Sequence, residues 1–210
     1  MRYNYIVIEG NIGAGKTSVA EIITAELNGR LVLEEFEDNS FLPKFYSNPE
    51  RFALPLELSF LADRYQQLIS TFSNPDLFKE TIISDYSVHK SLIFANINLK
   101  KDELFLFSKI YDIILPKIPQ PALYIYLHTA IEELQQNILK RGRSYEMDIH
   151  PDYLKKLEET YLEFLKKQIG MRVLIIENFK VNKIDQNDYS RRLLGLLDEE
   201  HSEGISYISF

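Results

Sequence analysis

The sequence contains no cysteine among its 210 residues, which excludes disulfides and metal sites built from thiolates. Basic residues are in the minority, since 24 Lys and Arg face 31 Asp and Glu and give a formal net charge of −7. Such a charge is unfavourable for a protein whose main partner is nucleic acid. The 45% hydrophobic and 26% charged composition is that of an ordinary globular domain.

Long apolar runs are also missing, because no stretch approaches the ~20 residues that a membrane-spanning helix needs. We therefore expect no membrane interaction. Residues 1–4 lead directly into the first predicted strand, so we expect no signal peptide and a cytoplasmic enzyme. The length suits one domain over residues 1–210 with a substantial core.

One stretch matches the complete phosphate-binding pattern G-x-x-x-x-G-K-[ST]. An apolar run at residues 5–8 precedes it and a helical pattern at residues 18–27 follows it, which is the strand–loop–helix context that the motif requires. Glycines let backbone N–H groups converge on phosphate oxygens, and the helix N-terminus adds positive potential. The motif predicts a nucleoside triphosphate site, with Lys16 at the β- and γ-phosphates and Thr17 at Mg²⁺. Its residues are Gly10, Asn11, Ile12, Gly13, Ala14, Gly15, Lys16 and Thr17.

Short apolar runs alternate with helical patterns along the chain, which predicts an α/β fold with a five-stranded parallel sheet covered by helices on both faces. The tail at residues 202–210 fits either a docked strand or a disordered end. The predicted strands are Tyr5–Glu9, Arg30–Glu34, Thr81–Asp85, Leu123–His128 and Arg172–Glu177. The predicted helices are Ser18–Leu27, Pro49–Phe72, Val88–Ile97, Asp102–Leu115, Ile131–Lys140, Pro151–Gln168 and Gln186–Leu197.

Acidic residues close two of these strands, at the edge where ligands of parallel sheets bind. Glu34 and Glu35 end the second strand, which we expect beside the P-loop strand. Either carboxylate could accept a hydroxyl proton during phosphoryl transfer, and we favour Glu34. Asp85 closes the third strand, where it could bind Mg²⁺, cap the following helix, or do both.

Two arginines, Arg141 and Arg143, follow the helix predicted to end at Lys140. A loop with two guanidinium groups can fold over a triphosphate and exclude water, so we predict a lid around residues 141–150. The alternative interpretation is a basic helix C-terminus, which the helix dipole favours.

An aromatic helical stretch carries Glu57, Phe60, Leu61 and Arg64 on one face, at positions i, i+3, i+4 and i+7. Two opposite charges beside apolar residues would suit a pocket for a nucleobase. From the spacing alone, core packing with a surface ion pair is the favoured interpretation.

Together these segments resemble the deoxynucleoside kinase family, especially its bacterial deoxyguanosine/deoxyadenosine kinase branch. The similarity runs from Ile6 to about Tyr189, through motifs at residues 8–17, 37–46, 56–65, 84–86, 92–95 and 140–143. It implies a P-loop kinase fold and the phosphorylation of a deoxynucleoside 5′-hydroxyl by ATP with Mg²⁺, with deoxyguanosine or deoxyadenosine as the favoured substrate. It also implies a homodimer.

The resemblance also implies a role for each matched side chain. For the nucleoside these are Glu34 as general base, Tyr46 and Glu146 at the sugar 3′-hydroxyl, Glu57 and Arg64 at the base edge, and Phe94 stacked on the base. For ATP they are the lid residues Arg141 and Arg143, Asp85 at the metal, and Asn178 and Phe179 in the adenine-contacting loop.

Three positions depart from the family pattern. Tyr86 replaces the arginine of animal members, so another cation must serve, such as Lys90 or a lid arginine. Asn137 stands where many relatives have a further lid-helix arginine. Glu57 replaces a glutamine, and an ionised glutamate only accepts hydrogen bonds, which suits guanine over adenine. That preference is lost if Arg64 engages the carboxylate or if burial protonates it.

Two other functions fit the P-loop less well. A nucleoside monophosphate kinase of the thymidylate kinase type needs extra cations for the acceptor phosphate, and the acids at Glu34 and Glu35 oppose that. A GTPase-like switch is suggested by residues 182–185, which match the guanine-reading pattern N-K-x-D. However, the residues after Asp85 lack the glycine of the D-x-x-G motif that senses the γ-phosphate.

Overall fold

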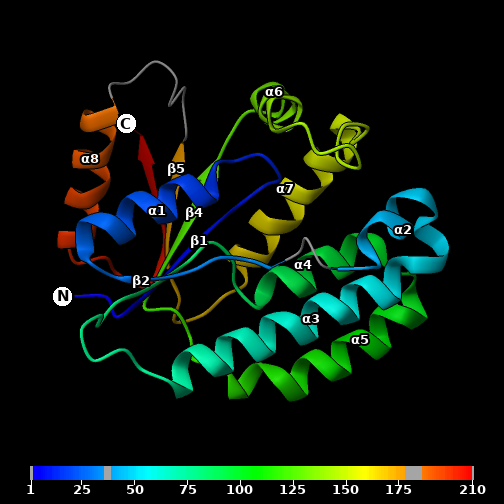
Figure 1. Ribbon diagram of the computed structural model, residues 1–210, viewed down its shortest axis with the longest axis horizontal. Helices are drawn as coiled ribbons and strands as arrows, with labels where there is room; N and C mark the ends of the chain where they lie inside the picture. The colour runs from blue at the N-terminus through cyan, green and yellow to red at the C-terminus, as the bar shows by residue number, and fades with distance from the viewer. Residues whose placement is uncertain (1, 36–38, 178–185, 210) are drawn as a thin grey trace. The chain divides into compact units, whose positions relative to one another are not determined.

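The computed structural model describes residues 2–35, 39–177 and 186–209, and they form parallel strands joined by helices (Figure 1). The elements of the first part of the chain are β1 (Tyr5–Gly10), α1 (Lys16–Leu27), β2 (Arg30–Val32), α2 (Leu42–Ser47), α3 (Pro49–Ser73), β3 (Ile82–Ser84), α4 (His89–Asn98), α5 (Lys101–Ile114) and the short 3₁₀ helix η1 (Leu115–Lys117). Those of the second part are β4 (Leu123–His128), α6 (Ile131–Arg141), α7 (Pro151–Lys166), β5 (Arg172–Glu177), α8 (Gln186–Asp198) and β6 (Gly204–Ser209).

The chain divides into two compact units. The first unit comprises residues 1–33, 76–86 and 120–210 and contains the whole sheet with α1, α6, α7 and α8. The second unit comprises residues 34–75 and 87–119 and contains α2, α3, α4 and α5. None of the helices in the described ranges combines the length and apolar composition needed to cross a membrane.

The sheet of the first unit is parallel throughout, in the order β2-β3-β1-β4-β5-β6. It has six strands, so the prediction of five is wrong: residues 204–209 pair with β5 from Arg172↔Gly204 to Glu177↔Ser209. The strand at this edge is only partly buried, which explains its weak sequence signal. The prediction that the second strand lies beside the P-loop strand is also wrong, because β3 lies between β2 and β1.

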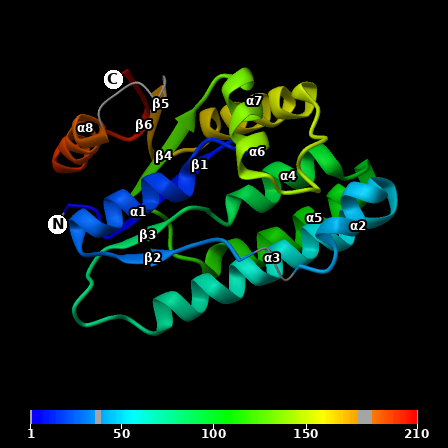
Figure 2. The same cartoon turned by 45° about the horizontal axis from the view of Figure 1, so that its top comes forward.

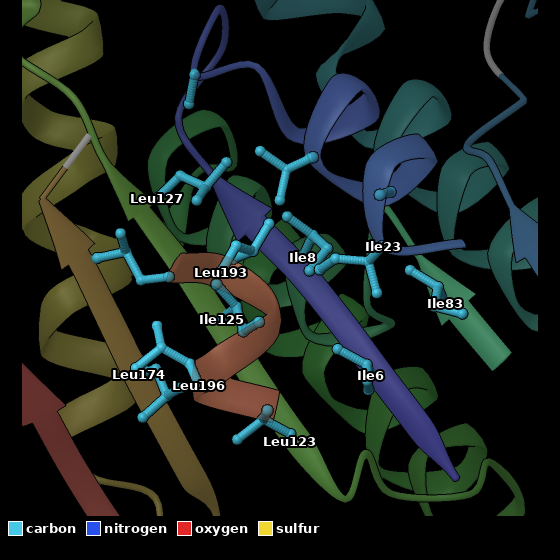
Figure 3. Close-up of a cluster of buried hydrophobic side chains, with 14 of the residues drawn as sticks. Ile6, Ile8, Ile23, Ile83, Leu123, Ile125, Leu127, Leu174, Leu193 and Leu196 are labelled. Atoms are coloured by element: carbon cyan, nitrogen blue, oxygen red, sulfur yellow. The ribbon is translucent and has the colours of Figure 1, made fainter. Parts of the chain in front are cut away.

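Helices cover both faces of this sheet, as the sequence predicts. On one face, Ile8 of β1 and Ile125 of β4 belong to a buried apolar cluster with Ile23 of α1 and Leu193 of α8 (Figure 3). Successive residues of a strand point to opposite faces, so Glu9 and Tyr126 face the other side. There the Tyr161 hydroxyl of α7 donates to Glu9 Oε2 over 3.0 Å, and the Tyr126 and Tyr161 rings lie 5.3 Å apart. Helices therefore pack against both faces of the sheet.

The second unit is helical, and α3, α4 and α5 lie side by side in both views (Figures 1 and 2). The sequence analysis predicted these three helices but missed the six-residue α2. α3 begins where Asn48 accepts a hydrogen bond from the Arg51 amide and Pro49 takes the first helical position. α4 and α5 are joined by a hydrogen bond between His89 Nδ1 and the Tyr111 hydroxyl, 2.6 Å apart.

Two strands end earlier than predicted, which places the acidic residues beyond the strands. β2 ends at Val32, so Glu34 lies two residues past it, and β3 ends at Ser84, so Asp85 follows it directly. α4 begins at His89 with Val88 as its N-cap. Asp85 therefore does not cap this helix, and that alternative is wrong.

Two glycines in the first unit should respond oppositely to alanine. Gly13 has φ +83°, and a Cβ there would lie 2.8 Å from the Leu134 carbonyl oxygen. We expect Gly13→Ala to lower the free energy of unfolding by at least about 1–2 kcal/mol, because the left-handed backbone disfavours a side chain. A Cβ at Gly195 in α8 would point into open space, so Gly195→Ala should raise the free energy of unfolding by about 0.5–1 kcal/mol. Urea unfolding measures both, and equal effects would contradict the assigned geometry.

Candidate active site

The phosphate-binding motif forms the turn between β1 and α1 in the first unit, and two asparagines hold it in place. Asn11 Nδ2 donates to the Leu154 carbonyl over 2.7 Å, while its Oδ1 accepts from the Ile12 amide over 2.8 Å. Asn137 Nδ2 of α6 donates to the Gly13 carbonyl over 2.9 Å. Asn137, which departs from the family pattern, thus anchors the loop in place of a lid-helix arginine. These hydrogen bonds thus fix the conformation of the loop between β1 and α1.

Lys16 and Thr17 at the start of α1 carry the polar groups of this loop. Lys16 Nζ donates to the carbonyls of Gly10 over 3.0 Å and Asn11 over 2.9 Å. The Thr17 hydroxyl donates to Asp85 Oδ2 over 2.6 Å, and Asp85 is 6% exposed. The two residues predicted to hold Mg²⁺ therefore lie within hydrogen-bonding distance of each other, and their role at a metal stays a prediction.

Both predicted lid arginines contact the same carboxylate in the first unit. α6 ends at Arg141, and Gly142 follows it as the C-cap with φ +71°. The chain then turns back, so that Glu146 is hydrogen-bonded to the Arg141 guanidinium. Arg143 approaches the other oxygen of Glu146 at 3.5 Å. Glu146 is 7% exposed, so one buried carboxylate joins the two cations.

Glu34 lies in the second unit between two cations from different helices. Arg64 of α3 donates from Nε to Glu34 Oε1 over 2.9 Å and contacts the same oxygen with a terminal nitrogen at 2.5 Å. Lys90 Nζ of α4 binds Glu34 Oε2. Arg64 also donates to the Ser91 hydroxyl over 2.6 Å. Lys90, one of the two cations that the sequence analysis named in place of the missing arginine, thus lies beside Glu34 together with Arg64, and its role in catalysis stays a prediction.

The charge state of Glu34 follows from this arrangement. Burial alone would raise the pKa of its carboxyl, but the charges and hydrogen bonds of Lys90 and Arg64 outweigh burial and hold the pKa well below its usual range. Glu34 is therefore ionised at neutral pH. Glu35, the alternative candidate, is exposed and accepts a hydrogen bond from Gln67 Nε2 over 3.1 Å.

Glu57 lies on α3 of the same unit and is 2% exposed. Its Oε1 accepts from Asn98 Nδ2 over 2.8 Å. Its Oε2 has no hydrogen-bond partner within the described part of the chain. Burial raises the pKa of Glu57 to about 7, although the Asn98 hydrogen bond and the charges of Arg64 and Lys90 lower it. The surface ion pair that spacing favoured is not what forms, because Arg64 turns to Glu34.

The remaining predicted nucleoside residues are placed as follows. Tyr46 lies on α2, half-buried, with its ring edge-on to Phe45 at 5.5 Å. Phe94 lies on α4, where Lys90 Nζ is 5.6 Å from its ring centre. Tyr46 belongs to the second unit and its predicted partner Glu146 to the first. Asn178, Phe179 and the N-K-x-D match at 182–185 lie outside the described residues.

Sequence reasoning missed Asn98 and Ser91, which bind Glu57 and Arg64. Neither residue carries a local signal, because the bonds join positions 41 and 27 residues apart. Lys90, in contrast, was already named by the sequence analysis.

Several known proteins are similar to this chain over most of its length. A family model described as deoxynucleoside kinase matches residues 6–200. A deoxyguanosine kinase of Bacillus subtilis is 36% identical over 190 residues, which cover 86% of this chain and 91% of that protein. A deoxyadenosine kinase of Lactobacillus acidophilus is 24% identical, with 94% of this chain and 96% of that protein covered.

Solved structures share the fold. The deoxyadenosine kinase from M. mycoides with bound dATP gives a TM-score of 0.79 at 22% identity, and the alignment covers 93% of this chain and all of that one. The same enzyme with bound dCTP gives a TM-score of 0.78. A family model that spans almost the whole chain and a relative at 36% identity show that the chain belongs to the deoxynucleoside kinase family.

Proposed function

We propose that this member of the family transfers the γ-phosphoryl group of ATP to the 5′-hydroxyl of a purine deoxynucleoside. The observation that carries the proposal is Glu34, a partly buried carboxylate (14% exposed) that Arg64 and Lys90 keep ionised. An ionised carboxylate can accept a hydrogen bond, and then the proton, from a neutral hydroxyl. It would repel the phosphate of a monophosphate acceptor, which favours a nucleoside.

ATP is proposed to bind the first unit through the P-loop amides. Lys16 would exchange its bonds with the Gly10 and Asn11 carbonyls for bonds with phosphate oxygens, which are the better acceptors. The Thr17 hydroxyl and Asp85 carboxylate offer the oxygen ligands that Mg²⁺ prefers. Within the described ranges no three His, Cys, Asp or Glu side chains form a metal cluster, which fits an ion that keeps waters and phosphate oxygens. When bound, Mg²⁺ neutralises negative charge on the phosphates.

The nucleoside is proposed to bind the second unit. Glu34 orients the 5′-hydroxyl and takes its proton, while Arg64 and Lys90 hold the carboxylate in place. Family resemblance supports Tyr46 and Glu146 at the sugar 3′-hydroxyl, Phe94 stacked on the base, and Glu57 with Arg64 at the base edge. The low exposure of Glu57 suits a group that recognises a base away from water.

The loop at residues 141–150 is proposed to act as a lid. Arg141 and Arg143 would leave Glu146 and bind the transferring phosphoryl group, where their charge is needed as the bond to the leaving group breaks. Adenine contacts by Asn178 and Phe179, a single domain over residues 1–210, homodimerisation and a cytoplasmic location stay predictions.

The choice of acceptor tests the proposed function. ATP consumption should be measured with each of the four deoxynucleosides and, separately, with their 5′-monophosphates. We expect a purine deoxynucleoside to stimulate ADP formation strongly and to appear as its 5′-monophosphate. Stimulation by a monophosphate alone would show that the acceptor is wrongly assigned. GTP turnover without any acceptor would instead support a switch protein.

The lid arginines can be tested with a neighbouring control. We expect replacement of both Arg141 and Arg143 by Gln to lower kcat on the order of 10³-fold, because the transition state loses its neutralising cations. Lys140 is exposed in the last turn of α6, so Lys140→Gln should keep the wild-type rate. Measurement at saturating ATP and nucleoside separates an effect on kcat from an effect on substrate binding. If the double variant has the same kcat as Lys140→Gln, Arg141 and Arg143 do not take part in phosphoryl transfer.

A further inference from the structure

Glu57 Oε2 is a buried oxygen of the second unit without a hydrogen-bond partner among the described residues. Buried polar atoms almost always have a hydrogen-bond partner. Glu57 Oε1 has Asn98, but within the described residues Oε2 has none. An unpartnered carboxyl oxygen at this depth can be satisfied by carrying a proton or by accepting a hydrogen bond from a bound ligand.

The charged groups around Glu57 leave its carboxyl able to gain or lose a proton near neutral pH. Arg64 on α3 and Lys90 on α4 favour the ionised form, and Glu34 opposes it. Both cations are hydrogen-bonded to Glu34, so neither neutralises Glu57 directly. Burial is the largest influence and sets the pKa at about 7.

The two forms of this carboxyl match different purines. An ionised carboxylate only accepts hydrogen bonds, whereas the neutral acid also has one O–H donor. Guanine presents adjacent N1–H and N2–H₂ donors, which a carboxylate can accept. Adenine presents an N1 acceptor beside an N6–H₂ donor, which requires one donor and one acceptor from the protein.

We propose that the protonation state of Glu57 selects the purine, with the carboxylate favouring deoxyguanosine and the neutral acid favouring deoxyadenosine. The inference rests on the proposed function, because it takes the second unit as the nucleoside-binding part. Substrate preference then depends on pH: kcat/KM for deoxyguanosine increases relative to that for deoxyadenosine as the pH rises.

The test is the ratio of kcat/KM for deoxyguanosine to kcat/KM for deoxyadenosine, measured from about pH 6 to about pH 8. The ratio cancels pH effects on ATP binding and on phosphoryl transfer. If each purine requires its own form of Glu57, the ratio follows that of carboxylate to acid and rises by up to about tenfold per pH unit. A ratio that stays constant over this range in the wild type overturns the inference.

Two variants and a control sharpen the test. Glu57→Gln should give a ratio that does not change with pH, because an amide donates and accepts without titrating. Asn98→Ala removes a hydrogen bond that favours the ionised form of Glu57. In this variant the rise of the kcat/KM ratio should therefore occur at higher pH. Glu35→Gln changes an exposed carboxylate of the same unit and should keep the wild-type curve. A purely structural role for Glu57 predicts equal losses for both purines in Glu57→Gln with the slope unchanged, which would also overturn the inference.

The titration can be followed without catalysis. The pKa of Glu57 is about 7 in the folded protein, whereas a glutamate in the unfolded chain has its ordinary pKa of 4.5. Between these values the folded state binds more protons, so its stability relative to Glu57→Gln should fall as the pH rises and level off above the higher value. If both purines are phosphorylated at a constant ratio, only this inference fails. If neither purine is phosphorylated, the proposed function fails.

Discussion

The carboxylate of Glu34, held between Arg64 and Lys90, is the interaction on which the second unit depends most. It joins the segment that follows β2 to α3 and α4 through charged hydrogen bonds that are almost fully withdrawn from water. Removal of one partner from such a cluster leaves a buried charge uncompensated, and this typically costs about 3–5 kcal/mol. The same pairing makes Glu34 a weak base. The proposed transfer does not need a stronger base, because the loose transition state of phosphoryl transfer depends on positioning and charge stabilisation more than on strong proton abstraction.

In the first unit, oxygen atoms of the protein hold each of the cations that we propose to bind a triphosphate. Lys16 is bound to two P-loop carbonyls, and Arg141 and Arg143 share Glu146. The loop itself is held by Asn11 and Asn137, so its amides need little reorganisation on binding.

Much of the fold was predictable because its signals are local. The P-loop, β4 and β5 lie where the pattern of apolar residues and glycines places them. The sixth strand was not predicted because an edge strand is half exposed and has a weak apolar pattern. The position of β3 between β2 and β1 depends on how the connections cross, which no local sequence pattern indicates. In the site, residue types at strand ends indicated Glu34 and Asp85. The partners of Glu34 and Glu57 were harder to predict, because Lys90 and Asn98 come from positions 56 and 41 residues away in the chain.

The turnover of Glu34→Gln beside Glu35→Gln tests the central role of Glu34 most directly. Both should be measured with saturating ATP and a purine deoxynucleoside, with ATP affinity and urea unfolding as checks that each variant folds. We predict that Glu34→Gln lowers kcat by about 10²-fold or more, a typical general-base effect, with ATP affinity unchanged. Glu35→Gln should turn over like the wild type, because its exposed carboxylate contacts only Gln67 among the hydrogen bonds described. A folded Glu34→Gln variant with wild-type kcat, or a loss confined to Glu35→Gln, would contradict the assignment.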